Sequence, residues 1–419
     1  MKKVLFISPT GTLDNGAEIS IINLMEYLVQ MKYEVYNIAP QHHHSKQIEY
    51  YDYCTAKGIQ TFFIPVLKWW WPDAPGGMPG TRSSRAEAYR ENVNEIRTII
   101  QKYDIDVIIT NTVNIFVGAI ASSCEGKKHI WLIHEFPENE FSYYKDKVSF
   151  IEQMSDQIFS VKGSLNVTLT KLFEKKVGTF VPFSKTKSTD IKKGDKTRIV
   201  CVGMVSERKN QIELIKAYEK LKKPLIELVF IGPEDSSYYK MCKRYIKEHK
   251  LDNISFLGYQ KNPWDLVTDK DICVFPSKNE TFGLVYVESI LNGVPTIISD
   301  NIGHLTANNL IKQGSIYKLG SIDQLTKSIL DCLDNFERIK RELIDASDML
   351  QNRFSVNSSY TDLICEIDKP KKTGYGELYF ISDLVSKNSD KSRIALTEIK
   401  VGNFFAKIKK RLRNRGEEK

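Results

Sequence analysis

The feature that most constrains the fold is an alternation of short apolar runs with longer amphipathic segments along most of the chain. The runs are rich in Val, Ile and Phe and about five residues long, the length of a typical buried strand. In the first half, strands are expected at residues 3–8, 34–39, 61–64, 106–110, 129–134, 157–161 and 177–181, and helices notably at 17–30, 84–102 and 147–155. Strands and helices that alternate in this way form parallel sheets wound from βαβ units.

A polar, lysine-rich stretch from Pro182 to Lys196 interrupts this pattern, which then begins again. Strands of the second half are expected at 198–203, 226–231, 254–257, 271–275, 295–299 and 315–319. The 419 residues, of which 42% are hydrophobic, suffice for two cores of ordinary size. We therefore predict an α/β protein with two Rossmann-like domains that face each other across a cleft, at residues 1–182 and 183–366, followed by a C-terminal extension at 367–419.

Hydropathy and cysteine usage argue against a membrane-spanning or secreted protein. No apolar run approaches the roughly 18 residues that a spanning helix needs. The apolar start, Val4 to Ile7, is short for a signal peptide, so we interpret it as a first buried strand. The 7 cysteines are scattered without Cys-x-x-Cys spacing, which favours reduced thiols and a cytoplasmic location.

The stretch from Phe275 to Glu288 carries the most chemical information. Glu280 follows an apolar strand, so it is expected at the carboxyl end of a parallel strand, where open α/β sheets bind ligands. A helix is predicted from Leu284 to Leu291, stopped by an Asn-Gly pair.

That helix and its N-terminus suggest the ligand. The backbone amides near Phe282, Gly283 and Leu284 would form a helix N-terminus that suits phosphate. Glu288, further along the helix, can accept hydrogen bonds from a vicinal diol such as a ribose. Sugar, phosphate and ribose partners in that order describe a nucleotide sugar.

Seven residues that include Phe-Gly-Leu separate the two glutamates, and Asn-Gly and Pro-Thr-Ile-Ile-Ser follow; in this pattern the chain resembles the family-4 (group 1) glycosyltransferases. These are retaining enzymes of the GT-B fold, and the resemblance covers roughly residues 1 to 365. It implies transfer of a sugar from a UDP- or GDP-type donor to an acceptor hydroxyl, without metal or cofactor. It also implies that Glu280 holds donor-sugar hydroxyls and Glu288 the ribose.

The resemblance further implies a division of labour between the domains. Residues 1–182 would bind the acceptor and residues 183–366 the nucleotide sugar, with the last helix, near 356–366, crossing back to the first domain. The acceptor is expected to be a glycan or a lipid-linked glycan in the assembly of a bacterial surface polysaccharide. Acceptor attack on the same face as the departing phosphate would explain retention.

Two cations, Arg208 and Lys209, lie between a predicted strand and the predicted helix 211–221. Cations at such a turn suit a diphosphate leaving group, whose charge grows as the glycosidic bond breaks. The resembling family places an arginine directly after the preceding glycine, where this chain has Met204. Lys209 matches the family's lysine, so we assign it to the diphosphate and expect Arg208 to replace the missing arginine.

Four further positions complete the expected site. His134 ends a strand where the resembling family has a histidine that faces the transferred sugar, and it could hydrogen-bond a sugar hydroxyl; Glu135 beside it is a candidate for the acceptor side. Gly16, in the turn before the first helix, would let backbone amides approach a diphosphate or acceptor. Gly232, at another strand end, is expected near the base.

Other motifs point away from catalysis. The run His42-His43-His44 has no companion ligand, and no Asp-x-Asp pair ends a strand, so no metal site is predicted. Three adjacent tryptophans, at 69–71, lie in a Pro/Gly-rich insertion and would pack on a helix, on sugar rings or at a membrane interface.

The C-terminal extension ends in a basic amphipathic segment, 403–415. Its aromatic and aliphatic residues lie near one helical face, and lysines and arginines dominate the rest, which is typical of a helix on an anionic membrane surface. A peripheral position on the inner face of the cell membrane is therefore expected. Binding to nucleic acid is not expected, because nothing else in the chain suggests base recognition.

Two other functions remain open at this point. A nucleotide-sugar epimerase shares the twin-domain fold but needs no acceptor. A non-catalytic partner subunit on the same scaffold would bind glycan or another enzyme without consuming a donor, and Met204 makes this alternative conceivable.

Overall fold

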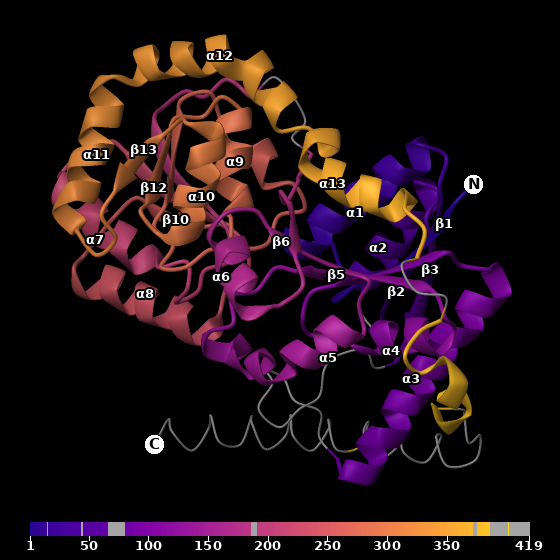
Figure 1. The fold of residues 1–419 in the computed structure, drawn as a ribbon. Coiled ribbons are helices and arrows are strands. Elements are labelled where there is room, and N and C mark those ends of the chain that lie inside the picture. Colours follow the sequence, from indigo (N-terminus) through magenta and orange to yellow (C-terminus); the bar gives the residue numbers. More distant parts are fainter. Residues whose placement is uncertain are drawn as a thin grey trace. The chain divides into compact units, whose positions relative to one another are not determined.

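The computed structural model describes residues 1–14, 16–42, 45–65, 80–185, 191–371, 375–385 and 401. The chain divides into two compact units, of which the first comprises Met1–Pro182 with Ser359–Lys419 and the second Phe183–Ser358. Figure 1 shows the elements of both units along the chain. Each unit is described separately below.

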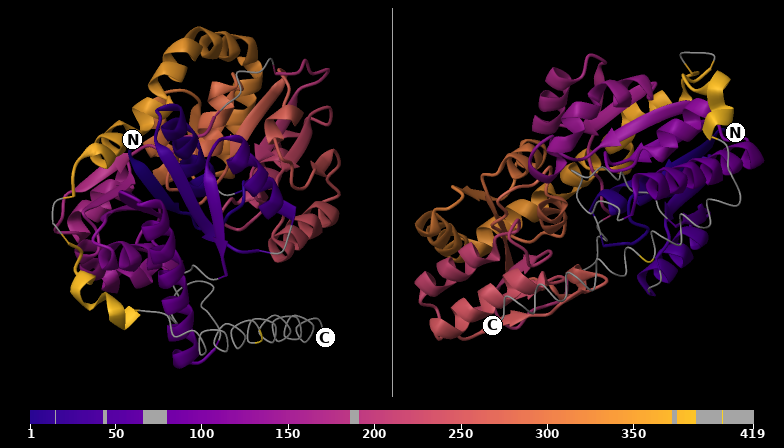
Figure 2. Two further views of the ribbon diagram at one scale, coloured as in Figure 1. Left: turned by 90° about the vertical axis from the view of Figure 1, so that its right-hand side faces the viewer. Right: turned by 90° about the horizontal axis from the view of Figure 1, so that it is seen from below.

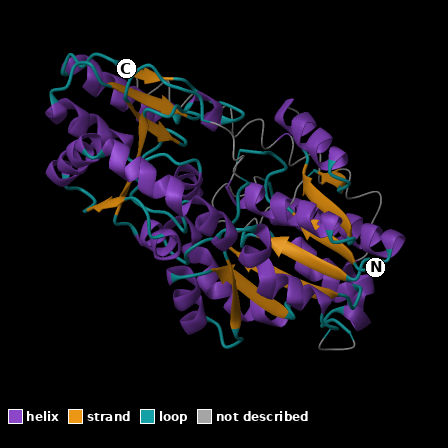
Figure 3. Ribbon diagram, turned by 90° about the horizontal axis from the view of Figure 1, so that it is seen from above, coloured by secondary structure: helices purple, strands orange, loops and turns teal. Residues whose placement is uncertain are grey.

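The described residues of the first unit form a seven-stranded parallel sheet in the order β3-β2-β1-β4-β5-β6-β7. Its strands are β1 (Lys3–Ile7), β2 (Glu34–Pro40), β3 (Gln60–Ile64), β4 (Val107–Asn111), β5 (Lys128–Ile133), β6 (Gln157–Val161) and β7 (Val177–Phe180). The side chains of the central strand β1 from Val4 to Ile7 are completely buried, as expected where helices cover both faces of a parallel sheet. Helices flank the strands of the sheets in Figure 3.

The helices of this unit are α1 (Gly16–Gln30), α2 (Ser45–Ala56), α3 (Arg82–Tyr103), α4 (Val117–Cys124), η1 (Asn139–Lys147), α5 (Val148–Gln153), α6 (Ser164–Leu172), α13 (Val356–Asp368) and η3 (Tyr379–Val385). From Ser359 onward, α13 belongs to this unit. The ammonium groups of Lys2 and Lys128 donate to the carbonyl oxygens of Ile367 (2.6 Å) and Glu366 (2.5 Å). They thereby bind the C-terminus of α13, where the helix carries partial negative charge.

The described residues of the second unit form a six-stranded parallel sheet in the order β10-β9-β8-β11-β12-β13. Its strands are β8 (Arg198–Val202), β9 (Glu227–Ile231), β10 (Ile254–Phe256), β11 (Asp271–Phe275), β12 (Thr296–Ser299) and β13 (Ser315–Tyr317). Its helices are α7 (Gln211–Leu221), α8 (Ser236–Glu248), η2 (Pro263–Leu266), α9 (Leu284–Leu291), α10 (Ile302–Ile311), α11 (Ile322–Asp334) and α12 (Phe336–Arg353). Figure 2 gives two further views of these elements.

Both sheets have a topological switch point, where successive connections turn in opposite directions. It lies between β1 and β4 in the first unit and between β8 and β11 in the second. The loops that leave these strands diverge at the carboxyl edge of the sheet, and ligands of open α/β sheets bind there. The topology therefore makes the loops after β1 and β4, and after β8 and β11, the candidate ligand-binding loops.

The predicted α/β fold with two parallel sheets is confirmed, and each predicted strand lies within two residues of an observed one. The helices α2, α4 and α6 were not specified in advance. In α4, seven of the eight residues are buried, so its sequence lacks the one-sided apolar pattern by which a surface helix is recognised.

Three features of the sequence lie wholly or partly outside the described residues: the tryptophans at 69–71, the basic segment 403–415, and His43 with His44. His42 is described, and its Nε2 lies 2.9 Å from the carbonyl oxygen of Thr10, so this histidine contacts the loop after β1. Within the described residues, no helix is long and apolar enough to cross a membrane.

Candidate functional site

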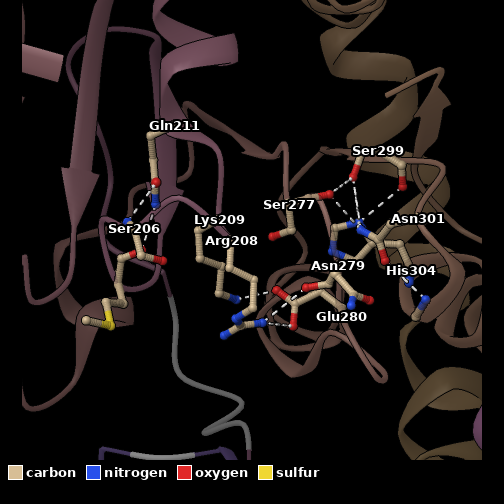
Figure 4. Close-up of polar contacts among 12 residues, drawn as sticks. Ser206, Arg208, Lys209, Gln211, Ser277, Asn279, Glu280, Ser299, Asn301 and His304 are labelled. Carbon is tan, nitrogen blue, oxygen red and sulfur yellow. Dashed lines mark hydrogen bonds and ion pairs between the residues drawn. The ribbon is translucent and has the colours of Figure 1, made fainter. Parts of the chain in front are cut away.

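The second unit brings together two loops at its switch point, the one from β8 to α7 and the one from β11 to α9 (Figure 4). The backbone N–H of Lys278 donates to the carbonyl oxygen of Arg208 at 2.8 Å. The side-chain amide of Asn210 donates to the carbonyl oxygen of Pro276 at 3.2 Å. Asn210 takes a left-handed backbone conformation (φ 57°) at the start of α7, which asparagine tolerates better than most residues. These contacts hold the two loops edge to edge.

Glu280 forms ion pairs with both cations of the neighbouring loop. Its Oε1 lies 2.6 Å from the Lys209 ammonium and its Oε2 lies 2.8 Å from the Arg208 guanidinium. Glu280 is 9% exposed, and burial alone would raise the pKa of its carboxyl; the charges of Lys209 and Arg208 overcome that effect and hold the pKa at about 2. The Lys209 side chain is 13% exposed and that of Arg208 is 54% exposed, so Lys209 is the more enclosed cation.

Helix α9 begins at Leu284, as the sequence predicts, with Gly283 as its N-cap residue at φ 92°. A left-handed conformation there favours glycine. Phe282 is buried and anchors the turn that leads into the helix. The orphan amides of the first turn therefore lie next in the chain to the Glu280 cluster, where they suit an anion.

Glu288 lies in the second turn of α9. Its Oε2 accepts a hydrogen bond from the Trp264 indole N–H at 3.0 Å, and it also interacts with the Ser184 hydroxyl. Burial raises the pKa of its carboxyl, and these two hydrogen bonds and the charge of Lys209 oppose that effect. Glu288 is thus a half-buried acceptor that already receives hydrogen bonds from protein donors.

Close packing of two strand ends requires glycine at position 232. A Cβ on Gly232 would lie 2.2 Å from the carbonyl oxygen of Gly203, so only glycine lets the end of β9 approach the end of β8 this closely. Met204, which stands where the resembling family has an arginine, is 44% exposed.

The first unit places His134 beside its own switch point. His134 Nε2 lies 2.7 Å from Asn111 Oδ1, and the Asn111 amide nitrogen donates to the carbonyl oxygen of Ala17 at 3.2 Å. Because that second bond fixes the orientation of the amide, Nε2 must carry the imidazole proton and Nδ1 is a hydrogen-bond acceptor. Burial lowers the pKa of His134 to about 3, so the imidazole is neutral at physiological pH.

Two carboxyls stabilise the loops around His134. Glu135 Oε2 accepts from the backbone N–H of Val113 (3.2 Å) and of His134 (3.0 Å), so it connects the ends of β4 and β5. Glu18 Oε2 accepts from the backbone N–H (3.0 Å) and hydroxyl (2.9 Å) of Thr10 in the loop after β1. Burial raises the pKa of both carboxyls, that of Glu135 to about 7.

Gly16 begins α1 in this same loop region, whereas Gly11 is the residue with a left-handed backbone (φ 64°). A Cβ on Gly11 would lie 2.9 Å from Ala39 Cβ. Close packing against β2 therefore requires glycine at position 11, whereas the approach of backbone amides to a ligand near Gly16 stays a prediction.

The structure thus groups the predicted residues by unit. Arg208, Lys209, Glu280 and the start of α9 form one cluster, with Glu288 one turn further; His134 and Gly16 belong to the other unit. Sequence reasoning did not single out Asn111, Trp264 or His304 as site residues. The position of Asn111 at the carboxyl end of a central strand could have indicated it. Within the described residues, no three His, Cys, Asp or Glu side chains gather as metal ligands do.

The second unit and the fold of the chain are similar to those of known glycosyltransferases. Residues 184–346 match the family of glycosyl transferases group 1. The poly(glycerol-phosphate) alpha-glucosyltransferase of Bacillus subtilis (strain 168) is 27% identical over 146 residues, which are 33% of this chain and 21% of that protein. The chain therefore spans about a fifth of the length of this curated relative.

Solved structures extend the likeness to most of the chain. HepE of Anabaena, solved with UDP and glucose, has a TM-score of 0.70 at 16% identity and covers 88% of this chain and 99% of its own. A variant of TarM from S. aureus, solved with fondaparinux, alpha-GlcNAc-glycerol and UDP, has a TM-score of 0.67 at 11% identity over 88% of this chain and 100% of its own. Residues 184–346 are therefore similar to glycosyl transferases group 1, and the chain shares the two-sheet GT-B fold of these solved structures.

Proposed function

We propose that this protein is a retaining glycosyltransferase that moves a sugar from a nucleoside-diphosphate sugar to an acceptor hydroxyl. The observation that carries the proposal is Glu280, a buried and ionised carboxylate held between Lys209 and Arg208 at a switch point. A carboxylate with two cations and a helix N-terminus beside it offers acceptors for sugar hydroxyls and donors for phosphates within one cluster. The group 1 match covers these same residues.

Each residue has a distinct role in this proposal. Lys209, Arg208 and the amides of Phe282, Gly283 and Leu284 bind the diphosphate and stabilise its charge as the glycosidic bond breaks. Glu280 accepts hydrogen bonds from hydroxyls of the donor sugar, Glu288 from the ribose, and the loop at Gly232 lies beside the base. The reaction needs no metal ion, because the cations and the helix N-terminus neutralise the leaving group.

The resting contacts must rearrange when a donor binds. In the structure the two cations neutralise Glu280. A diphosphate would draw them toward its oxygens, and hydroxyls of the sugar would replace them on Glu280. The acceptor hydroxyl attacks from the face that the phosphate leaves, and the leaving phosphate oxygen takes its proton, so the configuration is retained.

The first unit is proposed to bind the acceptor, with Gly16 and Glu135 at its edge and the neutral His134 offering Nδ1 to a sugar hydroxyl. The TarM complex with a glycan and the relative that acts on poly(glycerol phosphate) favour a glycan or lipid-linked acceptor of a surface polysaccharide. UDP occurs in the HepE and TarM structures, which favours a UDP-type donor over a GDP-type one. A cytoplasmic enzyme that docks to an anionic membrane through residues 403–415 would meet such an acceptor.

The test is to incubate the protein with a panel of UDP- and GDP-sugars and to quantify released nucleoside diphosphate, with and without glycan acceptors. We expect release from one donor, and its loss in Glu280→Ala. Glu207→Ala is the matched control, because Glu207 lies in the same loop as the cations but its side chain is 80% exposed and contacts Lys278 instead.

Other outcomes identify the alternatives. An epimerised nucleotide sugar without release of diphosphate would make the protein an epimerase. If calorimetry detects no nucleotide binding and no donor is turned over, the donor site is refuted and a non-catalytic subunit is favoured.

A further inference from the structure

His304 is a buried histidine at the start of α10, beside Glu280, and no role has been given to it so far. Its side chain is completely buried, and its Nε2 has no hydrogen-bond partner among the described residues. A buried polar atom without a partner is costly, and such atoms are uncommon in folded proteins. The orphan nitrogen therefore needs an explanation.

Two glycines hold His304 against the Glu280 loop. A Cβ on Gly303 would lie 2.1 Å from the carbonyl oxygen of Glu280, so the start of α10 rests on that residue's backbone. A Cβ on Gly283 would lie 2.7 Å from His304 Cδ2 and 3.3 Å from its Nε2. The imidazole edge thus contacts the N-cap residue of α9, at the proposed donor site.

The hydrogen bonds of Asn301 and Ser299 hold the imidazole of His304 in place (Figure 4). Asn301 Oδ1 caps α10 by accepting from the backbone N–H of Gly303 (3.1 Å) and of His304 (3.0 Å). The amide nitrogen of Asn301 lies 2.8 Å from His304 Nδ1, and the carbonyl oxygen of Ser299 lies 3.1 Å from the same atom. Within the described residues these polar neighbours all meet Nδ1, so Nε2 is the imidazole nitrogen that a ligand can satisfy.

Glu280 lies beside this nitrogen. Its carboxylate is paired with Lys209 and Arg208, and its charge acts on His304, although burial dominates and lowers the pKa of the imidazole to about 4. When a diphosphate draws the two cations away, the carboxylate needs other hydrogen-bond donors. A sugar carries neighbouring hydroxyls that both donate and accept, so it can satisfy the carboxylate and Nε2 together.

We propose that His304 Nε2 and the Glu280 carboxylate together bind hydroxyls of the donor sugar, so that His304 is a specificity-determining residue of the donor site. The inference rests on the proposed glycosyltransferase function. It excludes donors in which the hydroxyl at His304 is replaced by hydrogen or a bulky substituent, because the buried Nε2 would stay unpaired or the group would not fit. A phosphate oxygen fits this pair poorly, since it brings negative charge to Glu280.

Two substitutions test the roles of the two imidazole nitrogens one at a time. In His304→Gln the amide nitrogen replaces Nε2, and in His304→Asn the amide oxygen replaces Nδ1, which Asn301 contacts. We expect His304→Asn to lower kcat/KM for the donor about tenfold, the loss of one buried hydrogen bond, and His304→Gln to stay within about threefold of wild type. The affinity for the free nucleoside diphosphate, measured by calorimetry, should not change in either variant.

Donor analogues and a control sharpen the test. For the monodeoxy donor that lacks the bound hydroxyl, His304→Asn and wild type should be equally slow. His129→Asn removes a buried imidazole from the first unit, where Thr110 and Ser155 satisfy both nitrogens. It should lower the melting temperature and leave donor turnover per folded molecule unchanged.

Opposite results would overturn the inference. If His304→Asn is normal and His304→Gln is impaired, the histidine acts only through Asn301; if both turn over donor normally, it makes no donor contact. Should the variants not fold, ¹⁵N spectra of wild-type histidines decide, because the Nε2 signal of His304 must shift with the intact donor and not with the diphosphate alone. A wild type that consumes no donor and binds no nucleotide would instead refute the proposed function itself.

Discussion

The two switch points of this protein share one topology and have opposite electrostatics. At the β8/β11 edge, Glu280 is ionised with a pKa of about 2 between two cations. At the β1/β4 edge, His134 is neutral with a pKa of about 3, and burial raises the pKa of Glu18 and Glu135. Loss of solvent alone would raise the pKa of both Glu280 and Glu135, so the presence of cationic partners decides which carboxyl stays charged.

The comparison teaches how one fold serves two kinds of ligand. A site with charged and mobile partners suits an anionic diphosphate, which can replace Glu280 as the partner of Lys209 and Arg208. A site of neutral donors and acceptors suits sugar hydroxyls, which bring no charge. The predictions below test this contrast, beginning with the largest expected effect.

Glu280→Ala should break the charged site most completely. Release of nucleoside diphosphate from the donor should fall on the order of 1000-fold, because the sugar loses its acceptor. The affinity for the free diphosphate should rise or stay constant, since Lys209 and Arg208 lose their competing partner. Calorimetry and turnover on the same preparation measure both, and a parallel loss of diphosphate affinity would contradict the assigned roles.

Lys209→Met should weaken the binding of the free diphosphate by about 10- to 100-fold, the range for a lost hydrogen bond to a charged group. Arg208→Met should weaken it by only about threefold, because this side chain is 54% exposed and its charge is screened. Calorimetric titration of both variants at one ionic strength tests the ranking. Equal effects would mean that exposure does not distinguish the two cations.

Glu280→Gln and Glu135→Gln should change the pH dependence of stability in opposite directions. The folded pKa of Glu280 is depressed to about 2 from 4.5, so its contribution is present above pH 4.5 and lost as pH falls toward 2. The folded pKa of Glu135 is raised to about 7 from 4.5, so its contribution is present below pH 4.5 and lost as pH rises toward 7.

Thermal unfolding across pH 3 to 9 measures these slopes. Between pH 4.5 and 8, wild type should lose stability relative to Glu135→Gln, by a melting-temperature difference on the order of 5 °C. Below pH 4.5, wild type should lose stability relative to Glu280→Gln. A pH-independent offset in either variant would show that the carboxyl does not have the assigned pKa.

The smallest effect concerns His134, which should stay neutral with its proton on Nε2 down to about pH 4 because its pKa is about 3. ¹⁵N spectra of labelled histidine would show this tautomer directly. In Asn111→Leu, which removes the acceptor of the Nε2 proton, the tautomer should become mixed while donor release in the other unit is unchanged. An imidazolium signal at pH 6 would contradict the neutral character of this site.

Much of the fold and part of the site could be predicted from the sequence. The strands were predictable because each is a short apolar run bounded by polar residues, and α9 because Gly283 and Asn292-Gly293 bound it. Glu280, Lys209 and Arg208 could be named because they follow strands that end at a carboxyl edge. His304, Trp264 and Asn111 could not, because the sequence does not show which side chains meet across a sheet edge.

By itself, the sequence determined the alternation of strands and helices, the parallel sheets and the residues that leave each strand, since these depend on local pattern and on the fixed handedness of βαβ connections. Only the tertiary structure decided what those residues do to one another. It joined Glu280 to Lys209 and Arg208, turned the His134 proton toward Asn111, and left Nε2 of His304, beside Gly283, without a partner in the described part of the chain. Charge state and tautomer depend on distances of a few ångströms between residues far apart in the chain, and local sequence does not encode those distances.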